Sequence, residues 1–163
     1  MKAEYLSKYI IAYLNNKGYA VTNSMLQRLL YYIEAWGQVY FDGIIDDDFE
    51  AWGSGPLIYD IMKKYNSFGV KPIDQEYEKG ETAFSFIKRF RDEFGKDEIS
   101  KDKIEMIEVV LRRYGVNSPL TLEMLSQSQE PWIEARKGYG PLDECRNIIS
   151  KEKMKTYYSS LIK

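Results

Sequence analysis

Apolar residues in the first part of the chain recur every three or four positions, which is the period of an amphipathic helix. The first series ends at the helix-breaking residues 15–18, Asn-Asn-Lys-Gly, and consists of Leu6, Tyr9, Ile10, Tyr13 and Leu14. A second series follows Thr22 and Asn23, either of which can cap a helix N-terminus. It consists of Leu26, Leu29, Leu30, Ile33 and Trp36, and Tyr31, Tyr32 and Tyr40 widen it. The pattern predicts two helices, of which the second is expected to be central.

The helical period breaks at Asp42-Gly43, and short apolar stretches follow it. The spacing of Ile44-Ile45 and residues 49–52 predicts that they pair as a small β-hairpin. Residues 53–56, Gly-Ser-Gly-Pro, then predict a turn in which Pro56 takes the first position of a third helix, where its missing N–H costs no hydrogen bond. The apolar positions of that helix are Leu57, Ile58, Ile61, Met62 and Tyr65, and it should end near Gly69.

The remainder of the chain also shows mainly helical spacing. Polar residues 71–79 predict a surface loop, and residues 83–94 fit a helix, although Phe84 and Phe86 also suit a strand. Ser100 is expected to cap a helix that carries Ile104, Ile107, Val110, Leu111 and Tyr114 and closes at Gly115. A short helix is expected after Ser118-Pro119 and a short turn after Glu130-Pro131, and a final helix, capped by Ser150, should carry Met154, Tyr157, Tyr158 and Leu161.

These elements together predict a mainly α fold: one compact helical domain over residues 1–163, with a short β-hairpin between the second and third helices. Hydrophobic residues make up 44% and charged residues 29% of the chain, as in globular proteins. No stretch approaches the ~20 apolar residues of a membrane helix, and the N-terminus lacks signal-peptide features. Cys145 is the only cysteine, which suits a reducing compartment, so we expect a cytoplasmic protein without a membrane partner.

The chain contains no histidine, which removes the usual general base at neutral pH and the commonest metal ligand. We therefore expect a binding protein rather than an enzyme, with no catalytic residues and no cofactor. An enzyme that uses carboxylates alone would need a deep pocket with paired acids such as Glu50 and Asp60.

The 23 basic residues nearly cancel the 25 acidic ones, which disfavours nucleic-acid binding. The basic residues Arg28, Lys63, Lys64, Arg112 and Arg113 are dispersed and are expected to lie on solvated helix faces.

Two short motifs resemble ligand sites. The acids Asp46, Asp47, Asp48 and Glu50 suggest a metal site, but their spacing is not that of a calcium-binding loop, and a solvated acidic turn is the preferred interpretation. Residues 53–56 resemble a phosphate-binding loop but lack the Lys-Ser/Thr that follows in one. A tight turn with Trp52 anchored against the core explains them better, since glycine permits positive φ. No metal site is expected.

Aromatic residues make up 15% of the chain, including fourteen tyrosines. Those at helical spacing are assigned to the core, because apolar helix faces usually pack inward. Aromatic residues in loops and at helix ends are better candidates for a protein interface, where tyrosine and tryptophan bury a large area at low entropic cost. Tyr59, Trp132 and Tyr139 are such candidates.

Several of these segments, in this order, resemble the motifs of the Panacea domain, the antitoxin domain found in SocA-like and GepA-like phage-associated proteins. Residues 26–32, Leu-Gln-Arg-Leu-Leu-Tyr-Tyr, are similar to its helix-two signature, and residues 50–59 are similar to its Ala-Trp and Gly-Pro motif. Residues 125–132, which end in Pro-Trp, resemble its third motif, and Tyr114-Gly115 occupies the place of its tyrosine-glycine break. The chain has Gly53-Ser54 where the family has larger residues, and Ser126-Gln127 where the family often has Thr-His.

The resemblance covers residues 3–140 and implies an antitoxin that binds and neutralises a toxin encoded beside it. In at least one family member this occurs by delivering the toxin to a cytoplasmic protease. Trp52, Gly55, Pro56 and Trp132 are then expected to be structural residues, and Tyr59, Gln127, Trp132 and Tyr139 are candidate contacts to the partner. The alternative is a DNA-binding regulator associated with a phage or mobile element.

Overall fold

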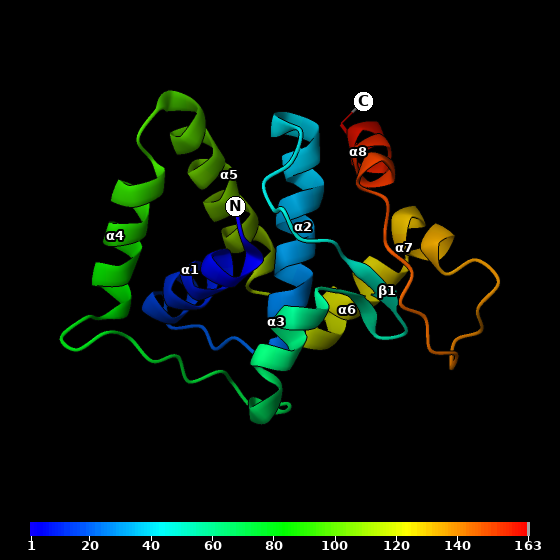
Figure 1. The fold of residues 1–163 in the computed structure, drawn as a ribbon, viewed down its shortest axis with the longest axis horizontal. Helices are drawn as coiled ribbons and strands as arrows, with labels where there is room; N and C mark the ends of the chain where they lie inside the picture. The colour runs from blue at the N-terminus through cyan, green and yellow to red at the C-terminus, as the bar shows by residue number, and fades with distance from the viewer. Residues whose placement is uncertain (163) are drawn as a thin grey trace.

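The computed structural model describes residues 1–162, which form eight α-helices, one 3₁₀ turn and two short strands. Helix α2 (Asn23–Phe41) runs through the middle of the molecule (Figure 1). On one side lie α1 (Ala3–Asn16), α4 (Ala83–Phe94) and α5 (Glu98–Tyr114), and on the other α6 (Pro119–Gln127), α7 (Glu130–Ala135) and α8 (Lys151–Ser160). Between α2 and α3 (Tyr59–Lys64), strands β1 (Glu50–Trp52) and β2 (Gly55–Leu57) pair antiparallel, and the 3₁₀ turn is Asn66–Phe68. The prediction of a mainly α fold with a short hairpin between helices two and three is confirmed.

Helix α2 is central because it is buried on nearly all sides. It packs against α1, α5, α6, α8 and β2, and every residue from Met25 to Ala35 is buried, including Gln27, Arg28 and Glu34. A helix surrounded in this way has no solvated face on which polar residues can lie, so each needs a partner inside the protein. Thr22 caps its N-terminus by accepting the N–H of Met25 at 3.2 Å, as the sequence suggested.

Aromatic rings fill much of the core, as predicted for those at helical spacing. The ring centroids of Tyr9 on α1 and Phe90 on α4 lie 4.1 Å apart, and those of Tyr32 on α2 and Tyr114 on α5 lie 4.3 Å apart. Tyr40, at the C-terminal end of α2, is an exception because it is exposed. The ambiguous segment 83–94 is a helix, since Phe86, Ile87 and Phe90 pack inward while Phe84 is exposed.

The hairpin does not pair as the sequence predicted. Ile44 and Ile45 are not in a strand, because their N–H groups donate at 3.1 and 2.5 Å to the carboxylate of the buried Glu34. The predicted pairing of Ile44-Ile45 with residues 49–52 is therefore wrong. Strand β1 instead pairs with β2, with Ala51 opposite Pro56. On its other edge β1 bonds to residues 147–149, where the N–H of Ala51 donates to the carbonyl of Asn147 at 2.8 Å.

Two predicted helix starts are also wrong. Pro56 lies in β2 rather than at the start of a helix, and α3 begins at Tyr59. Helix α5 begins at Glu98, three residues before the expected position, because Asp97 accepts the N–H of Ser100 at 2.8 Å. Ser118 and Ser150 cap α6 and α8 as predicted. No helix among residues 1–162 combines the length and apolar character needed to cross a bilayer.

Candidate functional site

The turn of the hairpin is held by side chains from three helices. The four consecutive carbonyls of residues 51–54 each accept a hydrogen bond from a buried or half-buried side chain. In chain order of the carbonyls, the donors are Arg136 at 2.9 Å, Trp132 at 2.8 Å, Gln127 at 2.8 Å and Arg28. We call these four donors and residues 51–54 the hairpin cluster. Residues 53–54 form a tight turn between β1 and β2, and the donors of the cluster fix that turn through its carbonyl oxygens.

Arg28 lies beneath this turn with no ion pair among the described residues. Burial lowers the pKa of its guanidinium to about 10, and the nearby Glu123 carboxylate opposes that shift. Its Nε has no hydrogen-bond partner in the described structure. The expectation that Arg28 lies on a solvated basic face is therefore wrong. Arg28 is buried, and its guanidinium donates to the carbonyl of Ser54.

Gly55 is the residue that lets Arg28 approach the turn. Its φ is +124°, a conformation that residues with a side chain rarely adopt. A Cβ at this position would also lie 2.8 Å from a terminal guanidinium nitrogen of Arg28 and 3.1 Å from the hydroxyl of Ser126. Glycine is needed here because it tolerates the positive φ and because it leaves room for the guanidinium of Arg28. This is a physical reason for the glycine in the Gly-Pro motif.

A second group of contacts covers the outer face of the hairpin. The rings of Trp52 and Tyr59 stack with centroids 6.0 Å apart, and the guanidinium of Arg146 lies 4.1 Å from the centroid of Tyr59. Arg146 also donates to the carboxylate of Glu50 at 2.7 Å. Tyr59 is half-buried by these neighbours, so part of its ring remains open to solvent.

Three of the four candidate partner contacts lie near one another, because Trp132 lines one pocket with Tyr139 and shares the hairpin cluster with Gln127. Gln127 and Trp132 are in the hairpin cluster, where their side-chain N–H groups are engaged within the chain. Tyr59 lies on the outer face of the hairpin, and Tyr139 is exposed on the loop after α7. Arg136 orders that loop, because it donates to the carbonyls of Gly140 and Asp143. Whether these residues contact a partner stays a prediction.

Sequence reasoning missed Arg136 and Arg146 and misplaced Arg28. Arg136 follows Trp132 by four residues, so both lie on the same face of α7 and reach the same strand. That spacing was a usable signal. Arg146 carried no local signal, because its partners Glu50 and Tyr59 are distant in the chain.

The acidic run after α2 holds the start of the chain. The Asp46 carboxylate lies 3.1 Å from the Met1 amine, which lowers the pKa of Asp46, and Asp47 accepts the N–H of Ala3 at 2.8 Å. Within residues 1–162 no group of three or more acidic or cysteine side chains is placed to hold a metal ion. The acidic run therefore pairs with the N-terminal amine and accepts a backbone N–H at the start of α1.

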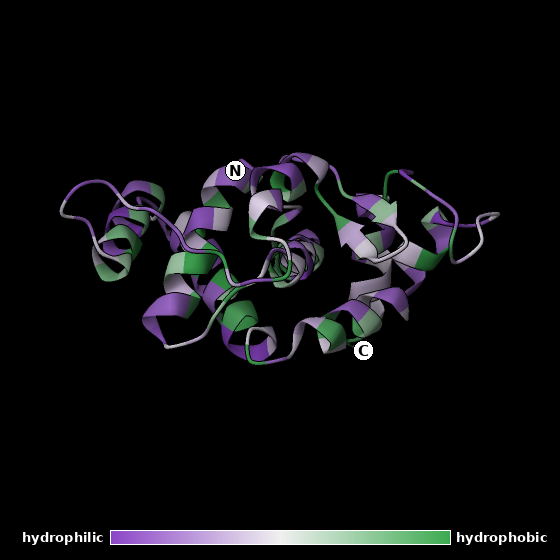
Figure 2. Ribbon diagram, turned by 90° about the horizontal axis from the view of Figure 1, so that it is seen from below, coloured by the Kyte–Doolittle hydropathy of each residue, from purple (hydrophilic) through white to green (hydrophobic). Residues whose placement is uncertain are grey.

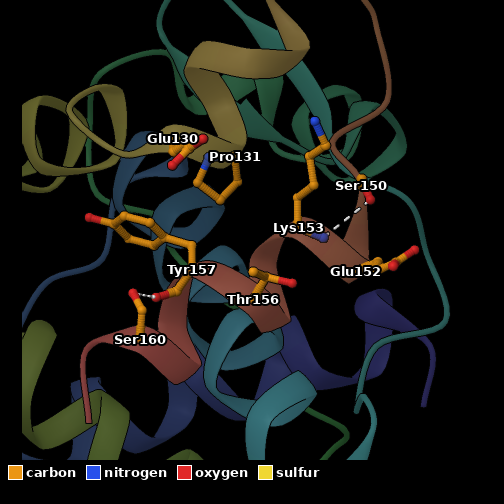
Figure 3. Close-up of a pocket in the computed structure, with 8 residues that line it drawn as sticks. All are labelled: Glu130, Pro131, Ser150, Glu152, Lys153, Thr156, Tyr157 and Ser160. Carbon is orange, nitrogen blue, oxygen red and sulfur yellow. Dashed lines mark hydrogen bonds between the residues drawn. The ribbon is translucent and has the colours of Figure 1, made fainter. Parts of the chain in front are cut away.

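A pocket between α7 and α8 is lined mostly by polar side chains (Figure 3). Its lining includes Pro131 from α7 and Tyr157 from α8. Ser150 is used as the cap of α8, and the Lys153 amine lies 2.9 Å from the Glu134 carboxylate. The lysine and the serine hydroxyl thus have structural partners.

Comparison with known proteins gives one match. A family model described as "Antitoxin SocA-like, Panacea domain" matches residues 26–133. The matched segment contains β1, β2 and three of the four donors of the hairpin cluster. No curated protein and no solved structure matches the chain.

Proposed function

Because the chain belongs to the SocA-like Panacea-domain antitoxin family, we propose that it is the antitoxin of a toxin–antitoxin system and neutralises its toxin by binding it directly. The observation that carries this proposal is the family match, which covers most of the chain from α2 to α7. A protein partner follows from the family, and the identity of that partner as a toxin is the proposal.

The state of the charged groups supports binding rather than catalysis. Glu50, one acid of the pair considered for a carboxylate enzyme, is buried and paired with Arg146, while Asp60 is exposed. The guanidinium of Arg146 thus gives the Glu50 carboxylate a structural role at the hairpin. We propose that the protein acts in stoichiometric amounts and performs no chemistry on its partner.

The basic residues likewise favour a protein partner over DNA. Arg28 is buried, Lys64 pairs with Glu4 at 2.6 Å, and Arg112 donates to the hydroxyl of Tyr13 at 3.2 Å. Residues already engaged in this way are less available to phosphates, which DNA-binding proteins contact with clustered free lysines and arginines.

Co-expression with the products of the adjacent reading frames tests the proposal. We expect one neighbour to stop growth when expressed alone, growth to recover when this chain is expressed with it, and the two proteins to co-purify in a fixed ratio. If no neighbour is toxic and no protein co-purifies, the antitoxin proposal fails. Specific DNA binding in a gel-shift assay, with affinity falling steeply as salt rises, would favour the regulator instead.

Toxin half-life distinguishes the two modes of neutralisation. If the antitoxin blocks the toxin, neutralisation needs about equal amounts of both proteins, and the toxin remains stable in the cell. If the antitoxin delivers the toxin to a cytoplasmic protease, toxin half-life falls when the antitoxin is present and recovers when the protease is absent. Both outcomes are forms of the proposed function.

A further inference from the structure

An apolar groove lies between the C-terminal half of α2, the C-terminal half of α5 and the two residues that follow α8. Its volume is about 520 Å³. It is lined by Trp36, Tyr40, Met106, Val109, Arg113 and Leu161, with Val110, Tyr114 and Ile162 completing it. In Figure 1 the end of α8 comes close to the C-terminal end of α2, and the ribbon beside the C-terminus is coloured as hydrophobic in Figure 2.

The rim of this groove exposes large apolar side chains. Tyr40, Val109, Leu161 and Ile162 are each between 46% and 57% exposed, although they surround one depression. Single exposed apolar residues are common, but several gathered at one hollow are typical of a surface that another molecule covers. The groove is therefore the strongest candidate for an interface in the part of the chain that the structure describes.

The floor of the groove is mostly apolar. The indole N–H of Trp36 donates to the Tyr114 hydroxyl at 3.2 Å, and the proton of that hydroxyl remains able to donate to an occupant. Arg113 is the one lining side chain that carries a full charge, and it makes no ion pair among residues 1–162. An occupant would therefore need apolar side chains for the floor and a carboxylate for Arg113.

We propose that this groove binds an amphipathic helix of the toxin, whose apolar face fills the groove and whose aspartate or glutamate pairs with Arg113. A helix suits the shape, because the walls are helices and the side chains of a third helix can fit between them. The positive charge of Arg113 determines which charge the helix must carry. An apolar segment flanked by lysine or arginine would place two positive charges together at Arg113. This inference rests on the proposed function and adds the location and chemistry of the contact.

Substitutions at exposed rim positions test the groove without disturbing the core. The groove variant is V109Q/I162Q, and the control is V70Q/I99Q, whose two positions are 94% and 64% exposed and do not line the groove. Isothermal titration against the toxin that co-purifies with the wild-type protein should show an affinity loss of about tenfold or more for the groove variant and within about twofold for the control. Circular dichroism of each variant confirms that the helices are intact.

The charge is tested separately. R113E should weaken binding about tenfold, and the loss should shrink as salt rises, because the new repulsion is screened. K71E changes an exposed lysine outside the groove and should leave binding unchanged.

Three results would overturn the inference. If the groove variants bind the toxin as the wild type does, the contact lies elsewhere and the proposed antitoxin function stands. If the wild-type protein is a dimer and V109Q/I162Q is a monomer, the groove is an interface between two copies of this chain. If the wild-type protein binds no toxin at all, the groove assignment and the proposed function both fail.

Discussion

The indole nitrogen of Trp132 donates a 2.8 Å hydrogen bond to the carbonyl oxygen of Trp52, 80 residues earlier in the chain. These two tryptophans belong to two motifs of the family, and the bond shows that the motifs form one structural unit. Gln127, from the same motif segment as Trp132, and Arg28, from the helix-two segment, donate to the same turn. These residues thus fix how α2, α6 and α7 meet the hairpin.

The first prediction concerns the approach of Arg28 to Gly55. G55A should lower the free energy of unfolding by about 3 kcal/mol, because it combines an unfavourable φ with a Cβ 2.8 Å from the guanidinium. Urea denaturation measures the loss. The matched control is G138A, where φ is also positive, at +90°, but no atom lies within 4 Å of the added Cβ. It should cost only about 1 kcal/mol, and equal losses in the two variants would show that the contact with Arg28 is unimportant.

The second prediction concerns Arg136, which is buried and donates to the carbonyls of Ala51, Gly140 and Asp143. R136M keeps most of the side-chain volume but removes every donor, and it should destabilise the protein by about 3 kcal/mol because those carbonyls lose their partner. The exposed neighbour provides the control, since K137M should change stability by less than about 0.5 kcal/mol. A thermal melt that leaves R136M level with K137M would contradict this role.

The sequence predicted the helices well and the hairpin poorly, for a physical reason. Helical periodicity is local, so the stripes of α1, α2 and α5 can be read without knowing what covers them. The strand partner of β1 depends on hydrogen-bonding groups outside the strands: Ile44 and Ile45 look like strand residues, but the carboxylate of the buried Glu34 accepts their N–H groups. The burial of Arg28 was also unpredictable from the local sequence, because it depends on the position of the hairpin that covers it.

The third prediction compares two possible caps of α5. The Asp97 carboxylate accepts the N–H of Ser100 at 2.8 Å, and this bond lowers the pKa of Asp97. D97A should therefore lower the free energy of unfolding at neutral pH. S100A should cost about half of that or less, because Ser100 adds only a hydroxyl contact to Asp97. Urea denaturation of both variants decides the matter, and a larger loss for S100A would place the cap where the sequence first suggested.

The sign of the pH effect on this cap also follows from the pKa of Asp97. Its folded-state pKa lies below the ordinary value of 3.8, so the contribution of the cap is present above that value and declines as pH falls through the folded-state pKa. The stability difference between wild type and D97A should therefore shrink in acid. A difference that stays constant down to the acid limit would show that the carboxylate charge is not involved.

The last prediction concerns alkaline pH and the buried tyrosines. Burial raises the pKa of Tyr65 to about 12, and it also raises those of Tyr9, Tyr31, Tyr32 and Tyr158. A phenol whose folded-state pKa exceeds its unfolded value contributes stability that is complete below pH ~10 and is lost as pH rises toward the folded-state value. Arg28 acts in the opposite direction, because its lowered pKa means that the unfolded chain holds the proton longer, but it is one group against several.

Stability should therefore fall above pH ~10, by at most about 1.4 kcal/mol per pH unit for each protected phenol. Ultraviolet absorbance should show the exposed tyrosines ionising first and the buried ones ionising together as the protein unfolds. Y65F removes one protected phenol, so its stability should fall less steeply between pH ~10 and ~12 than that of the wild type. Identical slopes for Y65F and the wild type would mean that Tyr65 ionises freely in the folded state.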